Sequence, residues 1–127
     1  MAGGGGGHAI LRHCVALPAL RIDLARVTEM PIRASALRGL GALVNVWAIE
    51  SVMDDLAHAV GEDPLAYRMR HLDDSRARDV LAKATEMAGW VTRGKREGIG
   101  QGLAVARYKG TGAWCAAVVE IEAAERI

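Results

Sequence analysis

The feature that most constrains the fold is a helical apolar periodicity that is interrupted twice between residues 42 and 88. In its first part, Ala42–Val60, the apolar residues recur at offsets of three and four, which places them on one stripe of a helix. These residues are Val46, Ile49, Met53, Leu56 and Val60. Gly61 follows the last of them, as is typical of the position after a helix. The pattern therefore predicts a helix over Ala42–Val60 that buries one face.

Aspartates at two positions predict the starts of two further helices. Asp63-Pro64 predicts a new helix over Pro64–Leu72, with aspartate as the cap and proline in the first turn. Asp73 and Asp74 offer a cap for a third helix over Ser75–Ala88. The predicted buried stripe of the third helix consists of Ala77, Val80, Leu81, Ala84 and Met87. Three short amphipathic helices must pack against a shared surface, which the flanking segments have to supply.

The flanking segments show the alternation of strands. Ala19–Val27 alternates apolar and charged residues, and the loop Ile32–Gly41 follows it. After the helices, Gly98–Lys109 and Ala113–Ala123 are predicted to be strands, with a glycine-rich hairpin turn between them. We therefore expect an α+β fold with an N-terminal strand and loop, a three-helix segment and a C-terminal β-hairpin.

The length and the net charge of the chain limit the number of domains and the classes of partner. The chain has 127 residues, enough for one domain, and 16 basic against 15 acidic residues give a net charge of +1. This balance gives no electrostatic basis for nucleic acid as the main partner. No apolar run reaches the roughly 18 residues of a membrane span, so we expect no membrane insertion. Residues 1–17, with Gly3–Gly7, are predicted to be a flexible leader, and residues 18–127 to form the domain.

The loop Ala34–Ala42 is the most informative segment for chemistry. Arg38 stands between small or apolar residues and is followed by Gly39, Leu40 and Gly41, directly before a helix. Glycines let a backbone approach a ligand, helix-start amides donate to anions, and a guanidinium binds phosphate or carboxylate. A tight turn with a solvated or capping arginine is the alternative, and a short loop of this kind does not decide between the two.

Longer motifs resemble a known family. The stretch IRASALRGLGALVNVWAIESVMDDLAHAVGEDPLAYRMRHLDD is similar to the molybdopterin-binding large subunit of the xanthine dehydrogenase/aldehyde oxidase family. The resemblance is strongest to bacterial members such as nicotinate and isoquinoline dehydrogenases. It rests on an A-[FLM]-R-G-[FV]-G loop, a helix of the WAIESVMDDLA type, and a DP-x-x-x-R-x-x-[HN]-L segment, here Asp63-Pro64, Arg68, His71 and Leu72. The tail GIGQGLAVARYKGTGAWCAAVVEIE also matches, so the resemblance covers roughly residues 18 to 123.

The resemblance implies a partial domain of a larger molybdopterin-binding fold. It implies that Arg38, Gly39, Leu40 and Gly41 line the molybdenum centre and contact the cofactor. Xanthine-oxidising members carry a phenylalanine at the position of Leu40, so the resemblance does not imply purine specificity. The glutamate base and the other pterin loops of the family have no counterpart here, and no catalytic residue or metal ligand is therefore expected in this chain.

For the whole enzyme, the resemblance implies oxidative hydroxylation of an aldehyde or N-heterocycle with oxygen derived from water. The expected cofactor is molybdopterin in a dinucleotide form, with iron–sulfur clusters on a separate small subunit, because this chain has only Cys14 and Cys115. The other expected partners are the remainder of the large subunit and a small-molecule substrate, in the cytoplasm or, as in some relatives, the periplasm. A non-catalytic α+β scaffold or a gene relic of the same family is the alternative.

The remaining polar and aromatic residues receive structural interpretations. Glu50, Asp54 and Asp55 are predicted to form a solvated helix face, and His58 and His71 to be surface or partly packed residues. We expect Cys115 to be a small buried strand residue. The tryptophans Trp47, Trp90 and Trp114 are predicted to anchor the packing. Gly100-Gln101-Gly102 is interpreted as a bend in a strand rather than a cofactor loop.

Overall fold

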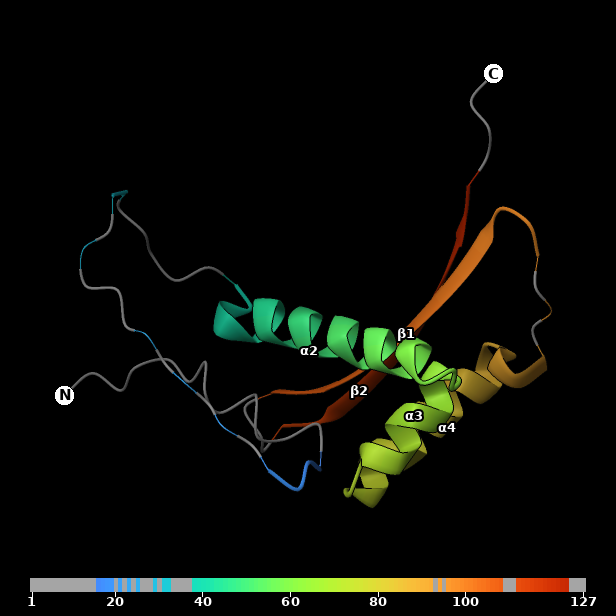
Figure 1. The fold of residues 1–127 in the computed structure, drawn as a ribbon, viewed down its shortest axis with the longest axis horizontal. Coiled ribbons are helices and arrows are strands. Elements are labelled where there is room, and N and C mark those ends of the chain that lie inside the picture. Colours follow the sequence, from blue (N-terminus) through green and yellow to red (C-terminus); the bar gives the residue numbers. More distant parts are fainter. Residues whose placement is uncertain are drawn as a thin grey trace.

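A computed structural model describes residues 16–19, 21, 23, 25, 29, 31–32, 38–92, 94, 96–108 and 112–123. Within them, three α-helices, a short 3-10 helix and two strands follow one another along the chain (Figure 1). The helices are α2 (Leu40–Ala59), α3 (Pro64–His71) and α4 (Ser75–Met87), followed by η1 (Trp90–Thr92). The strands are β1 (Ile99–Arg107) and β2 (Trp114–Glu122). The predicted three-helix segment and C-terminal hairpin are confirmed for these residues.

The two strands pair antiparallel, and the register aligns Ile99 with Glu122 and Arg107 with Trp114. Val105 lies opposite Ala116 in this register. After α4, the chain passes through η1 and enters β1 at Ile99 without a long loop. The hairpin turn itself, Gly110-Thr111-Gly112, lies mostly outside the described residues.

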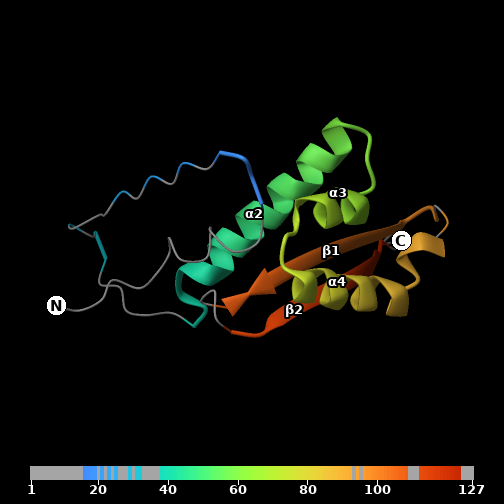
Figure 2. The ribbon, with the colours of Figure 1, turned by 90° about the horizontal axis from the view of Figure 1, so that it is seen from below.

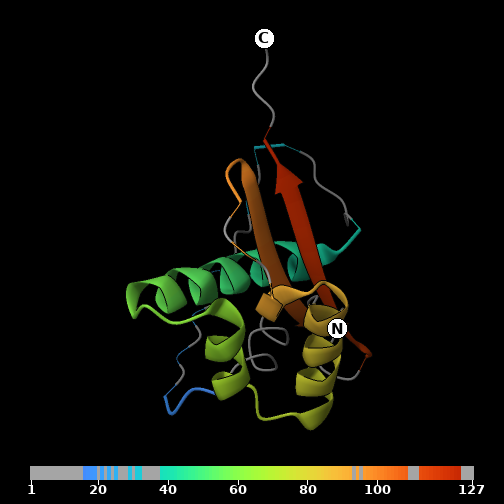
Figure 3. The same ribbon diagram turned by 90° about the vertical axis from the view of Figure 1, so that its right-hand side faces the viewer.

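The core lies between the helices and one face of the hairpin. Its buried members are Leu72, Ala77, Leu81, Trp90, Leu103 and Val105. Helix α4 runs alongside β2, whereas α2 crosses the direction of the strands (Figures 2 and 3). Burying these side chains stabilises the fold by roughly 25 cal/mol for each Å² of apolar surface that is removed from water. The layer of helices on one sheet face is the expected α+β arrangement.

Local sequence signals explain where α3 and α4 begin. The Asp63 carboxylate accepts hydrogen bonds from the Leu65 and Ala66 amides, at 2.9 and 3.3 Å. The Asp74 carboxylate accepts from the Arg76 amide at 2.9 Å. Hydrogen bonding from the Arg76 side chain leads the interactions that lower the pKa of Asp74. Both predicted caps are confirmed, and both helices start where the sequence places them.

The buried stripes differ in part from those predicted. On α4 the buried residues are Ala77, Leu81 and Thr85, whereas Met87 is 77% exposed, so its assignment to the core is wrong. Thr85 is tolerated in the core because its hydroxyl donates to the Leu81 carbonyl at 2.9 Å. Helix α4 ends at Met87, and the buried residue of its last turn is Thr85.

Two N-terminal predictions fall mainly outside the described residues. In the predicted strand Ala19–Val27, only residues 19, 21, 23 and 25 are described, and none of them lies in a strand. The predicted leader over residues 1–17 is described only at residues 16 and 17. Within the described residues, no helix is long and apolar enough to cross a membrane.

Candidate functional site

The candidate site is the turn Arg38–Gly41, which leads into α2. Arg38 is exposed, and it forms no ion pair with another described residue. Gly39 is the N-cap of α2 and adopts a left-handed conformation, with φ of 92° and ψ of −21°. Leu40 also has positive φ, at 48°, which is uncommon for a residue with a Cβ atom. Helix α2 begins at Leu40, two residues earlier than predicted, so Gly41 belongs to the helix.

The backbone at this turn requires glycine at position 39. A Cβ atom built there would lie 3.2 Å from the Cβ of Leu43, besides the cost of the left-handed conformation. The carbonyl of Gly39 accepts from the Ala42 amide at 2.9 Å, which closes the turn. The turn is therefore tight and places Arg38 immediately before the helix.

The start of α2 has no side-chain cap from the residues that the structure describes. None of their side chains accepts a hydrogen bond at its N-cap, and its first turn contains no acidic residue. The first amides of a helix lack intrahelical partners and carry part of the positive end of the helix dipole. Together with Arg38 they form a small electropositive surface, the kind that favours an anion. The structure thus places the four predicted residues together and leaves their ligand untested.

An apolar stripe continues from this turn along α2. It consists of four exposed residues at offsets of three, four and seven, namely Leu40, Leu43, Val44 and Trp47. Trp47 is 70% exposed, so its predicted role as a packing anchor is wrong among the described residues. Trp90 is buried and Trp114 is partly buried against the core, which confirms the prediction for those two.

The second half of α2 contains an ion cluster that the apolar pattern of the sequence does not predict. Glu50 is only 7% exposed, and Asp54 is half-buried, although both are predicted to lie on a solvated face. Only Asp55 of that predicted face is exposed. The buried line of α2 is Glu50, Met53 and Ala57, spaced by three and four residues. Of the predicted apolar stripe, only Met53 is buried, whereas Leu56 and Val60 are exposed, so the predicted buried face is wrong in its second half. The polar character of Glu50 concealed that it belongs to the buried face.

Arg68 of α3 is the reason that Glu50 can be buried. The Arg68 side chain is 1% exposed, and its Nε donates to Glu50 Oε2 at 2.9 Å. Its Nη1 donates to Asp54 Oδ1 at 2.6 Å, and its Nη2 to the Glu50 carbonyl at 2.9 Å. A further acceptor, the Pro64 carbonyl, lies 3.2 Å from Nη1. We call Glu50, Asp54 and Arg68 the ion cluster.

The ion cluster also reaches the sheet. Glu50 Oε2 accepts a hydrogen bond from the Val105 amide of β1 at 3.0 Å. Burial raises the pKa of Glu50, and the charge of Arg68 and the Val105 amide oppose that rise. One carboxylate therefore links α2 to α3 and to β1. The only sequence signal for this cluster is the family motif that contains Arg68.

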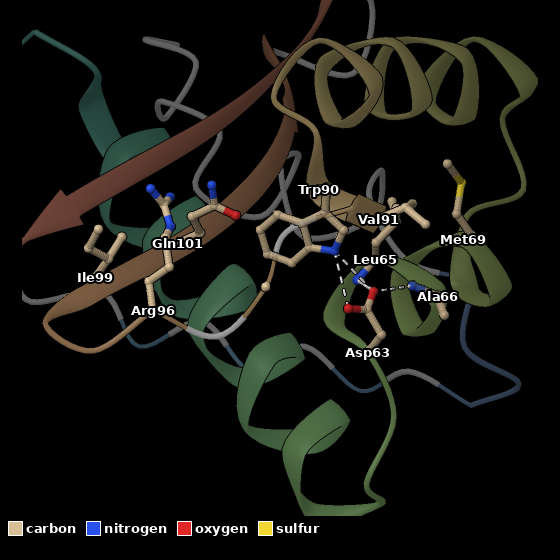
Figure 4. A pocket seen from close by; sticks show the side chains of 10 residues that line it. Asp63, Leu65, Ala66, Met69, Trp90, Val91, Arg96, Ile99 and Gln101 are labelled. Carbon is tan, nitrogen blue, oxygen red and sulfur yellow. Dashed lines mark hydrogen bonds between the residues drawn. The ribbon is translucent and has the colours of Figure 1, made fainter.

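A separate hollow of about 890 Å³ lies between α3, η1 and β1 (Figure 4). Apolar side chains such as Leu65 and Met69 line it, with Trp90 in its wall. The indole Nε1 of Trp90 donates to both oxygens of Asp63, at 3.1 and 3.2 Å. None of the residues that line this hollow belongs to the Arg38–Gly41 turn. The hollow and the candidate site are therefore different regions.

Gln101 in the wall of that hollow tests the interpretation of Gly100-Gln101-Gly102. All three residues lie in β1, which confirms a strand. The Gln101 side-chain amide donates to Glu120 Oε2 on β2 at 2.7 Å, whereas its buried Oε1 has no hydrogen-bond partner among the described residues. The segment contributes a cross-strand contact rather than a cofactor loop.

The other candidates are structural or solvent-exposed. His71 is half-buried beside the ring of Tyr67, and His58 is exposed. Cys115 is exposed on β2, so its predicted burial is wrong, because its strand position faces away from the core. Among the residues that the structure describes, no three histidine, cysteine or acidic side chains are grouped as a metal site would need.

Comparisons with known proteins address the region that contains the turn and the ion cluster. The model of a protein family described as "Molybdopterin cofactor-binding domain" matches residues 5–72. The chain is 37% identical over 116 residues to a nicotinate dehydrogenase subunit of Pseudomonas putida, covering 80% of this chain. It is 31% identical over 106 residues to the beta subunit of isoquinoline 1-oxidoreductase of Brevundimonas diminuta, covering 83% of this chain.

These relatives are much longer than the chain. The matched region covers 10% of the nicotinate dehydrogenase subunit and 13% of the isoquinoline oxidoreductase subunit. No solved structure matches the chain significantly. The similarity therefore concerns one segment of these large subunits, and this segment contains both the Arg38–Gly41 turn and Arg68.

Proposed function

Because the chain belongs to the molybdopterin cofactor-binding domain family, we propose that it forms one wall of the cofactor site in a molybdenum hydroxylase. In this proposal the Arg38–Gly41 turn faces the anionic part of the cofactor. The observation that carries it is the left-handed start of α2, which no described side chain caps, beside the exposed Arg38. Such a surface suits a phosphate-bearing ligand.

Two features of the turn fit this group. The first turn of α2 has no acidic residue to compete with an anion. Arg38 supplies donors in a planar arrangement that matches phosphate oxygens. Leu40 is half exposed and offers an apolar contact rather than an aromatic stacking surface.

The molybdenum of the bound cofactor would supply the redox chemistry, in which a substrate carbon is hydroxylated with oxygen derived from water. The residues of this chain would bind and orient the cofactor, and the catalytic base would come from other polypeptide. We propose aldehydes or N-heterocycles as the substrate class, and a dinucleotide form of molybdopterin as the cofactor. A separate small subunit with iron–sulfur clusters would accept the electrons in the cytoplasm or the periplasm.

The exposed apolar stripe supports a partner in the same proposal. This apolar stripe is of the kind that packs into an apolar groove, and it consists of Leu40, Leu43, Val44 and Trp47. The remainder of the large subunit is the partner that we propose for the apolar stripe. A non-catalytic scaffold of the same family would use the same stripe, so the stripe does not distinguish the two functions.

Cofactor content tests the proposal. The chain is co-expressed with the remainder of the large subunit in cells that supply molybdenum, and the molybdenum and pterin contents of the purified complex are measured for the original sequence, Arg38→Ala and Arg38→Lys. We expect Arg38→Ala to lower both contents several-fold and Arg38→Lys to lower them less, because lysine keeps the charge but loses the planar fork. Arg21→Ala is the matched control, since Arg21 is also exposed and pairs only with its neighbour Asp23 among the described residues.

Two outcomes would contradict the proposal. Equal contents in Arg38→Ala and Arg21→Ala would show that Arg38 does not contact the cofactor. If the original sequence carries neither molybdenum nor pterin, the scaffold alternative is favoured. An activity assay on an aldehyde and an N-heterocycle then identifies the substrate class in the protein that carries the cofactor.

A further inference from the structure

The two halves of α2 differ in how deeply the described residues bury them. The buried residues of this helix, Glu50, Met53 and Ala57, all lie in its second half. Leu43, Val44 and Trp47 in the first half are exposed. A helix is a stiff element, so the direction of the exposed half follows from how the second half is anchored.

The anchor is strongly directional. Apolar contacts allow neighbouring helices to slide, whereas a planar guanidinium accepts partners only in a fixed arrangement. Arg68 uses Nε, Nη1 and Nη2 to bind both acidic side chains of the ion cluster and the Glu50 carbonyl. The same Glu50 carboxylate binds the Val105 amide of β1. The position and tilt of α2 are thus fixed against two other elements at once.

We propose that Arg68 and Glu50 are positioning residues for the Arg38–Gly41 turn. The relevance to the cofactor rests on the proposed function, whereas the control of helix direction stands on the ion cluster alone. Ten residues separate Glu50 from Leu40, which corresponds to roughly 15 Å of helix. A tilt of about 15° at the cluster would move the turn by about 4 Å at that distance. Displacements of this size abolish ligand contacts.

The chemistry of buried ion pairs agrees with this role. Replacing a buried pair by apolar residues of similar volume is often neutral for stability, so stability alone does not explain such a pair. What an apolar replacement lacks is a preferred direction. A variant with an apolar pair should therefore fold and yet hold α2 loosely.

A distance measurement tests the proposal without any cofactor. Spin labels are placed at exposed Leu43→Cys on α2 and at the native Cys115 on β2, in a Cys14→Ser background of the whole chain. Pulsed electron paramagnetic resonance then gives the distribution of distances between the labels. We expect a single narrow distribution with the ion cluster intact. In the double variant Glu50→Leu, Arg68→Met, we expect it to broaden or shift by several Å.

Further variants keep the test decisive. Arg70→Met is the matched control, because Arg70 lies on the same helix but its side chain is 58% exposed and pairs with Glu62 outside the ion cluster. It should leave the distribution unchanged. Arg68→Lys keeps the charge and loses the fork, and we expect intermediate broadening. If the double variant does not fold by circular dichroism, Arg68→Lys and Glu50→Gln replace it.

The outcome that overturns the proposal is a folded ion-cluster variant whose distribution matches that of Arg70→Met. This result would assign the cluster to stability alone and leave the proposed cofactor contact of Arg38 unaffected. Conversely, a protein without molybdenum whose distribution still broadens would contradict the proposed function and leave the helix-directing role in place. The two failures are therefore distinguishable.

Discussion

Helices α3 and α4 begin in one way, and α2 begins in another. Asp63 and Asp74 each cap a helix, and each also accepts a hydrogen bond from a tryptophan indole, Trp90 or Trp114. Helix α2 begins at Leu40, after the N-cap Gly39, with no side-chain cap among the described residues. Aspartate carboxylates pair with the first amides of α3 and α4, whereas no described side chain pairs with the first amides of α2. The starts of α3 and α4 therefore stabilise the domain, whereas the start of α2 is suited to bind an anion.

The two regions also differ in what anchors them. Helix α4 buries Ala77 and Leu81 against the hairpin, so apolar burial determines its place. Helix α2 is attached by the ion cluster, in which the charged side chain of Arg68 is buried. A charge in that position is stable only while its partners are present. We therefore expect substitutions in the ion cluster to lower the free energy of unfolding most.

Arg68→Met should destabilise the chain most. The substitution leaves the buried Glu50 carboxylate without its cation, and breaking a buried pair costs about 3–5 kcal/mol. The free energy of unfolding, measured by urea denaturation, gives the loss. Arg70→Met provides the comparison, because the guanidinium of Arg70 is 58% exposed and ion pairs of solvent-exposed side chains contribute about 0–1 kcal/mol. Equal losses in the two variants would contradict the burial that we assign to Arg68.

Asp63→Ala should have the next largest effect. It removes the cap of α3 and the carboxylate that binds the Trp90 indole. We expect a loss of about 2 kcal/mol, from a cap worth about 1 kcal/mol and a comparable hydrogen-bond contribution. Thermal denaturation together with Trp90 fluorescence measures it. Asp73→Ala is the control, because Asp73 is exposed and does not cap a helix. A similar loss there would mean that the effect comes from charge rather than from capping.

Much of the capped region could be predicted from the sequence. The pattern predicts α3 over Pro64–Leu72, and the helix is found over Pro64–His71, because Asp63-Pro64 acts within a few residues. The strands are likewise predicted over Gly98–Lys109 and Ala113–Ala123, where alternation and glycine are local signals. Helix caps and periodicity concern neighbouring residues, so a single sequence contains them.

The environment of α2 could not be predicted in the same way. Glu50 can be buried because its carboxylate accepts hydrogen bonds from Arg68 and from the Val105 amide. These partners lie 18 and 55 residues away in the sequence. No local pattern encodes contacts over such separations. The same limit explains Trp47, which is expected in the core because tryptophan usually packs, although the described part of the chain leaves it exposed. The Arg38–Gly41 turn is predicted from its residue types, and its function stays a prediction.

Gly39→Ala should cost less than the two preceding substitutions. Residues with a Cβ pay about 1–2 kcal/mol in the left-handed conformation, and here the Cβ would also crowd Leu43. Gly61→Ala is the matched control, since Gly61 has φ of 70° but nothing lies within 4 Å of a Cβ there. We expect Gly39→Ala to lower the free energy of unfolding more than Gly61→Ala does. The reverse order would contradict the close packing of this turn.

The smallest effect is a change in pH dependence at Glu50. Burial raises the pKa of this carboxyl above its reference value of 4.5, so the folded state binds the proton more tightly than the unfolded state does. This contribution to stability is fully present below pH 4.5 and is lost as the pH rises through the raised pKa. Glu50→Gln cannot titrate and lacks the contribution at every pH.

Urea denaturation of both proteins between pH 7 and pH 4.5 isolates that contribution, because every other titrating group is shared. The free energy of unfolding of the original sequence should rise relative to that of Glu50→Gln as the pH falls. If Arg68 outweighed burial, the pKa of Glu50 would lie below 4.5 and the difference would shrink on acidification instead. The sign of this slope therefore shows whether desolvation or the guanidinium dominates at the point where α2 is attached.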